Sequence, residues 1–431
     1  MAAPLPRPLS SPTSDAGHRR IRPPLDAHAR RGGAGLPRRP VAGRAGPGSP
    51  VGSPAVPLRA AVDATPLLGA RTGVGVFTHA LLRGLGRHPD VEATAFPVSI
   101  SGRSRLRELV PAGVSVRTPP LPARALHRRW QHHGTPRIDR LVGRPDLVHG
   151  PNFVVPPSRA ARVATVHDLT TMRYPELSHA DTLRFPGMVR RAAAEGAWIH
   201  TVSHAVRDEV VAELDLDPER VVAVANGFDP PVGHAATGRR LAGVDAYVLA
   251  VGTVEPRKDL PSLVRAVDRL AAEHPDLVLV HAGGDGWQVE RLEEAVASMR
   301  HPDRFRRLGH VAHDQLGHLY AGARTYAYPS VYEGFGIPVL EAMSCDVPVV
   351  TTDVPAIREV AGDAAAIVPV GDVDALADAL ARSWTDEAWR VTAVERGRQR
   401  AALFSWDACV EGIVDLYRAA VAGSGRRTDR P

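Results

Sequence analysis

Lysine is almost absent from this sequence. Of its 53 basic residues, 52 are arginine, and the only lysine is Lys258. Arginine offers a planar fork of donors, whereas lysine is a compact point charge that reaches a phosphate from one direction. A lone lysine in so arginine-rich a chain is therefore a candidate for a specific ionic task. The alternative is an ordinary solvated lysine at the surface.

Cysteine and long hydrophobic runs are also scarce. The two cysteines, Cys345 and Cys409, form neither a disulfide framework nor a metal-ligand pattern, so a reduced cytoplasmic setting is the expectation. No apolar run approaches the ~20 residues that a membrane-spanning helix needs. The sequence therefore predicts a protein that does not cross a bilayer.

The excess of positive charge lies in the first residues. The chain carries a net charge of +6, but residues 1–50 contain nine arginines against two aspartates, so the rest is close to neutral. Residues 1–56 are rich in Pro, Gly, Ala and Arg, which predicts a disordered head. We favour the interpretation that an upstream start codon adds this head and that its residues have no function. We expect no nucleic-acid partner; binding through this head is a weaker alternative.

The 431 residues leave room for two domains. Strand-like runs alternate with helical patterns, which favours parallel sheets with helices on both faces. In the first half we expect a helix over 73–88 and strands over 58–64, 91–98, 145–150, 161–168, 197–203 and 220–227. In the second half we expect strands over 246–252, 276–283, 324–329, 347–352 and 364–370, then a helix over 406–423.

These runs predict an α/β chain with two Rossmann-like, doubly wound domains joined by a short linker. Two such domains would form a cleft between their strand ends, and clefts at domain interfaces are preferred ligand sites. The expected segments are a head (1–56), an N-terminal domain (57–230), a linker (231–245), a C-terminal domain (246–404), a C-terminal helix (405–423) and a tail (424–431).

The stretch from Tyr328 to Val350 carries the strongest pattern. Glu333 precedes the loop Gly334-Phe335-Gly336, Pro338 follows at a first helical turn, and Glu341 lies eight residues after Glu333. Pro is tolerated at a helix start and Gly permits close backbone approach, so a loop should end and a helix begin here. The free N–H groups of that helix would bind an anion such as phosphate. The alternative is a capped helix with two solvated glutamates.

Lys258 follows the strand-like run 246–252 and precedes a helix that should open at Asp259. It should therefore lie at the carboxyl end of a strand, the edge at which open α/β sheets bind ligands.

Five motifs together resemble retaining nucleotide-sugar glycosyltransferases of family four, over roughly residues 57–423. They are HDL (167–169), EPRKDL (255–260), GGDGW (283–287), YEGFGIPVLEAMSCDVPVV (332–350) and FSW (404–406). The resemblance implies the GT-B architecture, in which two Rossmann-like domains face each other across a cleft. The local pattern of these motifs is similar to that of bacterial mannosyltransferases, although users of UDP-sugars share most of these motifs.

The resemblance assigns most donor contacts to the C-terminal domain. It implies that Glu341 binds the ribose hydroxyls and that Lys258 neutralises the diphosphate. Glu333, Gly334 and the backbone of Phe335, Gly336 and Ile337 would hold the sugar and its phosphates.

Further roles are implied outside that stretch. His167 would lie near the transferred sugar and the acceptor, and Gly73 and Gly75 would let the backbone approach the diphosphate. The backbone of Gly309, His310 and Val311 would contact the base. Many members carry an arginine where this chain has Thr253, which leaves open whether Arg257 replaces it.

The implied reaction is substitution at an anomeric carbon, with a nucleoside diphosphate leaving. The resemblance favours front-face attack with retention, in which Glu333 positions the sugar and the departing phosphate oxygen takes the acceptor proton. We expect no cofactor and no metal, with GDP-mannose or a UDP-sugar as the substrate. The strings Asp372-Val-Asp374 and Asp215-Leu-Asp217 could suggest a metal, but Asp is also common where helices begin.

The acceptor is expected to be a glycan or a lipid-linked molecule. Residues 124–144 hold six arginines and three histidines against Asp139. This segment is either a solvated face or a peripheral contact with an anionic membrane. The same architecture also occurs in nucleotide-sugar epimerases and in proteins that bind such ligands without turnover, and these are the alternatives to a transferase.

Overall fold

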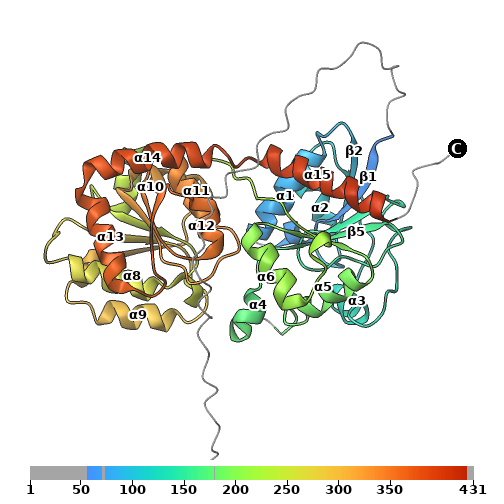
Figure 1. The fold of residues 1–431 in the computed structure, drawn as a ribbon, viewed down its shortest axis with the longest axis horizontal. Coiled ribbons are helices and arrows are strands. Elements are labelled where there is room, and N and C mark those ends of the chain that lie inside the picture. Colours follow the sequence, from blue (N-terminus) through green and yellow to red (C-terminus); the bar gives the residue numbers. More distant parts are fainter. Residues whose placement is uncertain (1–55, 70–72, 179, 425–431) are drawn as a thin grey trace, which may run out of the picture. The chain divides into compact units, whose positions relative to one another are not determined.

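The structure is a computed structural model that describes residues 56–69, 73–178 and 180–424. The predicted disordered head (1–56) lies outside the described residues except for Val56, and so does the tail beyond Ser424. The two sheets predicted from the alternation of strands and helices are both present (Figure 1).

The first sheet has seven parallel strands in the order β3-β2-β1-β4-β5-β6-β7. Its strands are β1 (Leu58–Asp63), β2 (Val91–Phe96), β3 (Ser115–Val116), β4 (Leu147–Gly150), β5 (Ala161–Val166), β6 (Trp198–Thr201) and β7 (Val221–Ala223). Its helices are α1 (Gly73–Leu85), α2 (Leu106–Leu109), α3 (Ala123–Trp130), α4 (Thr170–Arg173), α5 (Phe185–Ala194) and α6 (His204–Leu214).

The second sheet has six parallel strands in the order β10-β9-β8-β11-β12-β13. Its strands are β8 (Val248–Val251), β9 (Leu279–Ala282), β10 (Phe305–Gly309), β11 (Thr325–Tyr328), β12 (Val349–Thr352) and β13 (Ala365–Val368). Its helices are α8 (Leu260–Leu270), α9 (Val289–Ala297), α10 (His313–Gly322), α11 (Ile337–Ser344), α12 (Pro355–Ala361), α13 (Val373–Thr385) and α14 (Glu387–Ala401).

Short 3-10 turns complete both series: η1 (Thr65–Leu68), η2 (Arg103–Arg105), η3 (Pro175–Leu177), η4 (Pro218–Arg220), η5 (Pro256–Lys258) and η6 (Pro302–Arg304). No helix among the described residues combines the length and apolarity that crossing a membrane would require.

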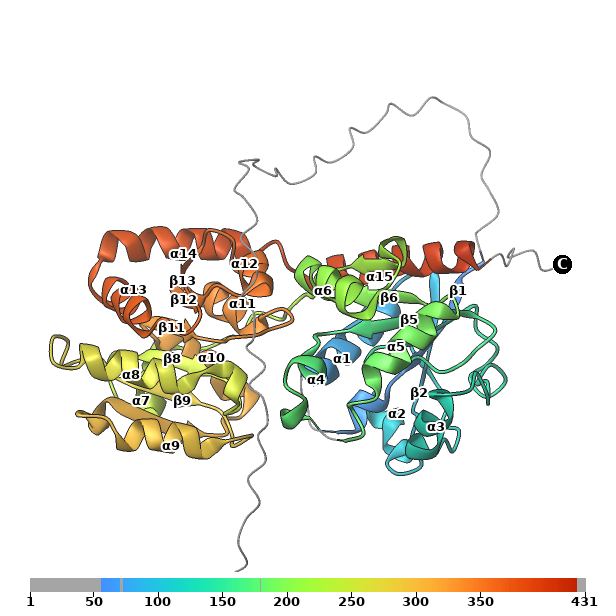
Figure 2. The same ribbon diagram turned by 60° about the horizontal axis from the view of Figure 1, so that its bottom comes forward.

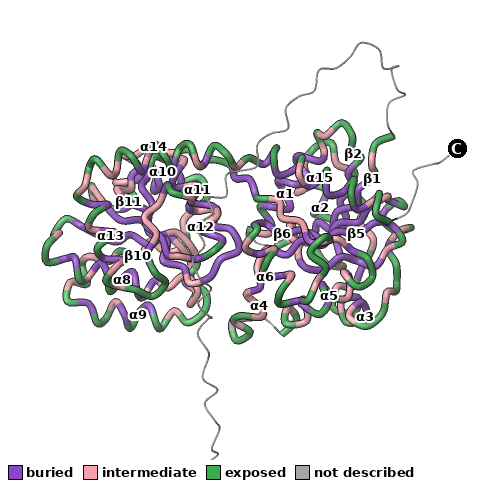
Figure 3. The backbone as a smooth tube through the Cα atoms, in the orientation of Figure 1, coloured by how far each residue is buried: buried purple, intermediate pink, exposed green. Residues whose placement is uncertain are grey.

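Each sheet is covered on both faces, as its continuous apolar strands predict. One face of the first sheet packs against α1 and the other against α3, α5 and α6. One face of the second sheet packs against α8, α9 and α13, and the other against α10, α11 and α12 (Figure 2). The central strands are consequently buried along their length (Figure 3).

The last helix, α15 (Trp406–Gly423), returns to the first half of the chain. Its inward side chains, including Trp406, Ile413 and Tyr417, belong to the same core as Phe77 of α1. The helix predicted over 406–423 is thus confirmed in its bounds, and it completes the layer that covers the first sheet (Figure 1).

The segment expected as a linker, 231–245, is not simply an irregular loop between the two sheets. It contains the helix α7 (Ala235–Ala242), which packs against α10. The contact is close because Gly238 has no side chain: a Cβ built there would lie 1.8 Å from the carbonyl oxygen of His318. The segment predicted as a linker is therefore partly helical and packs against the second half of the chain.

Candidate active site

The candidate site begins where the strand order of the second sheet reverses. β8 lies between β9 and β11, so the connections that leave β8 and β11 run in opposite directions along the sheet. Ligands of open α/β sheets bind at the carboxyl ends of strands at such a point. The turn after β8 carries Arg257 and Lys258, and the loop after β11 carries Glu333.

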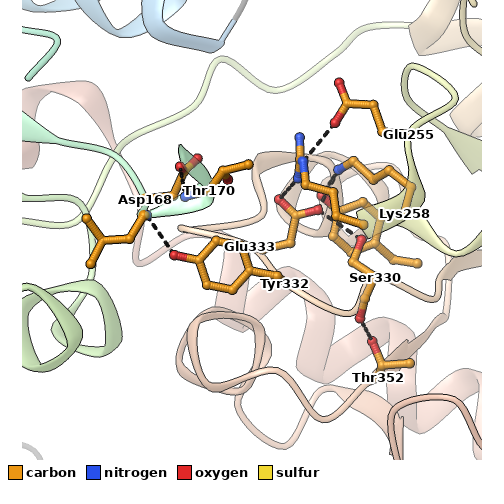
Figure 4. Close-up of polar contacts among 11 residues, drawn as sticks. Asp168, Thr170, Glu255, Lys258, Ser330, Tyr332, Glu333 and Thr352 are labelled. Atoms are coloured by element: carbon orange, nitrogen blue, oxygen red, sulfur yellow. Dashed lines mark hydrogen bonds and ion pairs between the residues drawn. The ribbon is translucent and has the colours of Figure 1, made fainter. Parts of the chain in front are cut away.

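Glu333 lies between two cations. Lys258 Nζ donates to its Oε1 at 2.6 Å, and Arg257 Nη1 lies 2.8 Å from its Oε2. Ser330 Oγ also donates to Oε1, at 2.9 Å. Only 9% of Glu333 is exposed, so its carboxylate is fixed by three donors from two loops (Figure 4). The sequence predicted Glu333, Lys258 and Arg257 individually, but not Ser330, and the structure brings the four together.

Tyr328 is a member of this cluster that the sequence reasoning missed. Lys258 Nζ donates to its hydroxyl at 2.5 Å and lies 4.4 Å from its ring centroid, so the ammonium contacts the hydroxyl end of the ring. Glu255 accepts from Arg257 Nε at 2.7 Å at the rim. Tyr328 ends a buried strand, which made it look like a core residue.

The electrostatics of the cluster keep its charges in place. Burial alone would raise the pKa of Glu333, but Lys258 and Arg257 outweigh it and lower that pKa to about 2. Burial lowers the pKa of Lys258 from its ordinary value, and the charge of Glu333 opposes that shift. Glu333 is therefore an anion at any working pH, and it helps Lys258 to keep its proton.

The helix α11 begins as the sequence predicted. Gly336 is its N-cap at φ 106°, a conformation that favours glycine, and Pro338 lies in the first turn. A Cβ built on Gly336 would lie 2.4 Å from Ile357 Cδ1. No side chain caps the helix, Pro338 has no N–H, and the N–H of Val339 donates to the carbonyl of Gly336 at 3.0 Å, so the N–H of Ile337 is the group left for another acceptor in this turn.

Glu341 lies about one turn into α11 and has one protein partner that the sequence did not indicate. The hydroxyl of Tyr320, a buried residue of α10, donates to Glu341 Oε2 at 2.9 Å. Burial raises the pKa of Glu341, and the hydrogen bond from Tyr320 acts against that shift. The contact orients the carboxylate and leaves Oε1 able to accept from a ligand hydroxyl.

His167 follows β5 in the first half of the chain. Its Nε2 lies 2.8 Å from the carbonyl oxygen of Pro151, which can only accept, so Nε2 carries the proton. Its ring meets Phe77 edge-on at 5.0 Å. Burial lowers the pKa of His167, so the ring is neutral at pH 7 and Nδ1 can accept from a hydroxyl.

The loop after β11 contacts the segment that carries His167. A Cβ built on Gly334 would lie 1.9 Å from the carbonyl oxygen of His167, so only glycine fits there. The Tyr332 hydroxyl accepts from the N–H of Leu169 at 2.7 Å (Figure 4). Ser203 Oγ donates to the carbonyl of Gly334 at 2.8 Å. Glu333 and His167 are thereby linked through backbone contacts.

The remaining predicted residues come from other elements. Gly73 and Gly75 form the first turn of α1, and Gly309 ends β10 at φ 70°, ahead of His310 and Val311. Among the described residues, no hydrogen bond joins them to Glu333 or Lys258. Their roles stay predictions.

Two further predicted positions have clear structural surroundings. The Phe335 side chain is buried edge-on against Phe404, which fits a role for its backbone alone. Thr253 packs its methyl group against Gly286, where a built Cβ would lie 2.6 Å away. Arg257, not Thr253, therefore stands beside Lys258.

The two aspartate strings have structural partners. Asp372 caps α13 by accepting from Ala375 N at 2.9 Å, and Asp217 accepts from Glu219 N at 3.0 Å. Asp215 ends α6 in the left-handed region. These positions confirm that the strings lie where helices begin or end. In the part of the chain that the structure describes, no group of His, Cys, Asp and Glu side chains has a metal-binding arrangement.

Two family patterns match this chain. Residues 71–231 match the family described as Glycosyltransferase Family 4, and residues 239–400 match Glycosyl transferases group 1. The second match contains the Lys258 and Glu333 cluster and α11, and the first contains His167.

Individual proteins agree with these matches. The chain is 34% identical to O-antigen chain mannosyltransferase B of Escherichia coli over 281 residues, which cover 63% of this chain and 74% of that protein. It is 31% identical to the D-inositol 3-phosphate glycosyltransferase of Salinispora arenicola over 288 residues, 61% of this chain and 64% of that protein.

Among solved structures, Anabaena HepE in complex with UDP-glucose is similar in fold. Its TM-score is 0.62 at 17% identity, over 84% of this chain and 99% of that chain. One conclusion follows from the two sheets, from the site where the strand order of the second sheet reverses, and from these matches. The chain belongs to the group 1 glycosyltransferases, with a family 4 N-terminal half, and has the GT-B fold.

Proposed function

We propose that this glycosyltransferase moves a hexose, with mannose favoured, from a nucleoside diphosphate sugar to a glycan or lipid-linked acceptor, with retention and without a metal ion. The observation that carries the proposal is the cluster of Lys258, Arg257 and Glu333 beside the uncapped start of α11. Because the relatives named above are glycosyltransferases, the alternatives of an epimerase or a binding protein without turnover are not favoured.

In this proposal the diphosphate binds at the start of α11. Charge develops on the departing phosphate, and preorganised donors stabilise it most when they need no rearrangement. Lys258, Arg257 and the N–H of Ile337 supply such donors, while Glu341 accepts from the ribose hydroxyls. The loss of one such group typically reduces kcat by about 100-fold or more.

Glu333 would position the sugar instead of attacking it. Its two oxygens already contact Lys258 and Arg257, and a carboxylate held in this way is a poor nucleophile. We therefore favour front-face attack, in which the leaving phosphate oxygen accepts the proton of the acceptor hydroxyl. His167, neutral with Nδ1 free to accept, would bind a hydroxyl of the sugar or the acceptor.

Mannose is favoured because a relative is named a mannosyltransferase, and GDP is favoured because the motif resemblance is to mannosyltransferases that use GDP-mannose. The name of the other relative, a D-inositol 3-phosphate glycosyltransferase, and the UDP-glucose bound to HepE favour neither mannose nor GDP. A UDP-sugar is thus the competing donor.

We also propose that the protein works in the cytoplasm and touches the inner face of the cell membrane through residues 124–144. In α3, Leu126 and Trp130 are buried while Arg124 and Arg128 are exposed, so the helix presents a basic face. Flotation with vesicles that contain anionic lipid is the measurement that tests this contact.

A donor screen tests the central proposal. Release of GDP or UDP from GDP-mannose and a set of UDP-hexoses is followed with EDTA present, and Glu341→Ala is the control. We expect release from one donor, lost in the control. Loss of activity in EDTA alone would contradict metal independence. No release and no thermal shift by GDP or UDP would favour a binding role, and an inverted product or a trapped glycosyl-enzyme would exclude front-face retention.

A further inference from the structure

A cavity lies at the amino ends of the strands of the first sheet, whereas His167 lies at their carboxyl ends. It has a volume of about 570 Å³ and is lined by five arginines and two aspartates: Arg59, Arg137, Arg140, Arg144, Arg159, Asp139 and Asp146. The lining comes from the starts of strands, since Asp146 immediately precedes β4 and Arg159 lies two residues before β5.

This position separates the cavity from the candidate active site. His167 directly follows the last residue of β5, whereas Arg159 precedes the first. Six residues at ~3.3 Å each span about 20 Å. The cavity is therefore independent of the sugar-transfer chemistry proposed above.

The charges that line the cavity do not cancel. Asp146 is paired with Arg59 at 2.8 Å. Asp139 is occupied by neutral donors, because it accepts from Ser158 Oγ at 2.8 Å and from the N–H of Arg159 at 2.9 Å. The guanidinium groups of four arginines have no ion pair or hydrogen bond among the described residues: Arg137, Arg140, Arg144 and Arg159. The lining thus carries three uncompensated positive charges.

The arginines stand on an ordered support. Between them, Ile138 and Val142 are each 1% exposed, and the N–H of Ile138 donates to the carbonyl of Pro157 at 3.1 Å. Arg144 adopts φ 53°, an uncommon conformation for a residue other than glycine, and its N–H donates to the carbonyl of Asp139 at 2.7 Å. The backbone that presents these charges is therefore fixed by packing and hydrogen bonds.

A sixth arginine lies beside this turn. A Cβ built on Gly143 would be 3.1 Å from Nε of Arg117, which follows β3. Like charges repel, and an anion bound in the hollow would relieve the part of this repulsion that solvent does not screen between the exposed guanidinium groups. A solvated basic face would more simply have its arginines spread apart or paired with acids, as most arginines elsewhere in the described chain are.

We propose that this cavity binds a phosphate-bearing ligand. Planar guanidinium groups pair with phosphate through two parallel hydrogen bonds, which is why arginine suits phosphate recognition. The volume lies within the range of small-molecule sites, so the ligand is larger than one phosphate ion. The phosphate can belong to a soluble molecule or to a lipid headgroup, and both present the same chemistry.

The test compares two double variants of the full chain. Arg137→Gln/Arg140→Gln removes two unpaired charges from the cavity. Arg107→Gln/Arg300→Gln is the control, because both residues are exposed and have no side-chain partner among the described residues. Each variant loses the same charge. Arg159→Gln, on another segment of the lining, is a second cavity variant in case the first fails to fold.

Two probes distinguish the sources of phosphate. The soluble probe is inorganic pyrophosphate, titrated calorimetrically; any binding elsewhere is common to all variants and cancels in the comparison. The lipid probe is flotation with phosphatidylcholine vesicles with and without phosphatidic acid. For the relevant probe, we expect the cavity variants to bind at least about tenfold more weakly than the wild type, while the control is unchanged.

Each outcome decides the proposal. Weakened pyrophosphate binding in the cavity variants alone assigns a soluble phosphate ligand. Weakened flotation with phosphatidic acid alone, in Arg159→Gln as well as in the double variant, assigns a lipid headgroup to the cavity, because Arg159 lies outside the membrane contact proposed for residues 124–144. If the cavity variants behave as the wild type with both probes, or if the control loses as much binding as they do, the cavity is a solvated basic face and the proposal is overturned.

Discussion

At the scale of single residues, the pairing of Lys258 with Glu333 combines two requirements. The lysine must stay charged in a buried position to meet a diphosphate, yet burial lowers its pKa. The carboxylate at 2.6 Å counters this effect and is itself kept ionised by the cations on either side. Glu333 thus keeps Lys258 protonated, in addition to any contact that Glu333 makes with the sugar.

This pairing predicts a shift in pH dependence for Glu333→Gln. The amide keeps the shape but removes the charge that raises the pKa of Lys258. Of the remaining effects, burial and the neighbouring charge of Arg257 lower that pKa, while the charge of Glu255, the smallest effect, raises it. Lys258 should then lose its proton at a lower pH. We expect the alkaline limb of kcat/KM to move to lower pH, beyond the loss in rate.

The control is Glu255→Gln, which removes a carboxylate that contacts Arg257 at the rim but does not contact Lys258. Its alkaline limb should move less. An alkaline limb at the same pH in Glu333→Gln and the wild type would show that Glu333 does not maintain the charge of Lys258.

At the scale of elements, most of the architecture could be predicted because the interior strands are continuous apolar runs. The missed strands are edge strands. β3 has two residues, and β10 reads FRRLG, in which two arginines hide the pattern. The start of α11 was predictable because Gly336 and Pro338 are specific signals for a helix N-terminus.

The partners of the site residues were less predictable, since they come from separate elements. Tyr320 of α10 reaches Glu341 of α11, and Tyr328 at the end of β11 reaches Lys258 of η5. A tyrosine in an apolar stretch looks like a core residue. Only the folded arrangement shows where its hydroxyl points.

The first turn of α1 yields a prediction that separates stability from donor binding. A Cβ built on Gly73 meets no atom of the described residues within 4 Å, and φ there is not in the left-handed region. Alanine favours a helix over glycine by up to about 1 kcal/mol. Gly73→Ala should therefore leave the thermal midpoint unchanged or higher. If the backbone of Gly73 approaches the diphosphate, the KM for the donor should rise several-fold.

Gly187→Ala is the matched control, because Gly187 lies in the first turn of α5 and its built Cβ also meets nothing within 4 Å. It should keep the wild-type KM. An unchanged KM in Gly73→Ala would contradict a close approach of this turn to the donor.

At the scale of the whole molecule, the return of α15 joins the end of the chain to the first sheet through a buried hydrogen-bond chain. His149 Nδ1 lies 2.6 Å from the Tyr417 hydroxyl, and His149 Nε2 lies 2.7 Å from Thr165 Oγ1. Thr165 Oγ1 lies 2.9 Å from His200 Nδ1, and His200 Nε2 lies 3.1 Å from the carbonyl oxygen of Val224.

The carbonyl oxygen of Val224 is the last acceptor, and it determines which atom carries each proton in this chain of hydrogen bonds. Because a carbonyl can only accept, His200 Nε2 donates to Val224, and Nδ1 of a neutral His200 accepts from Thr165. Thr165 then accepts from His149 Nε2, and His149 Nδ1 accepts from Tyr417. Both imidazoles must be neutral for this arrangement, and burial lowers the pKa of His200 to about 4 and that of His149 well below its ordinary value.

This chain of hydrogen bonds predicts that acid lowers the free energy of unfolding of the first half of the molecule by protonating His200. The unfolded chain takes up a proton on this histidine near pH 6.5, but the folded protein does so only near pH 4. The contribution of neutral His200 to the free energy of unfolding is fully present above pH 6.5 and declines as the pH falls to about 4. The slope approaches ~1.4 kcal/mol per pH unit. Asp63, whose pKa burial raises to about 6, acts in the opposite direction, so the wild type alone does not isolate the effect.

The comparison of His200→Gln with the wild type does isolate it, because glutamine does not titrate. We expect the variant to be less stable at pH 7.5 but to lose less of its thermal midpoint between pH 7 and pH 5. This window lies above the range in which Glu333 titrates, since its folded pKa is about 2. His133→Gln, at an exposed position, should follow the wild-type pH profile. Parallel profiles for His200→Gln and the wild type would show that the hydrogen-bond chain accommodates a protonated His200, because the neutral form would then contribute no pH-dependent stability.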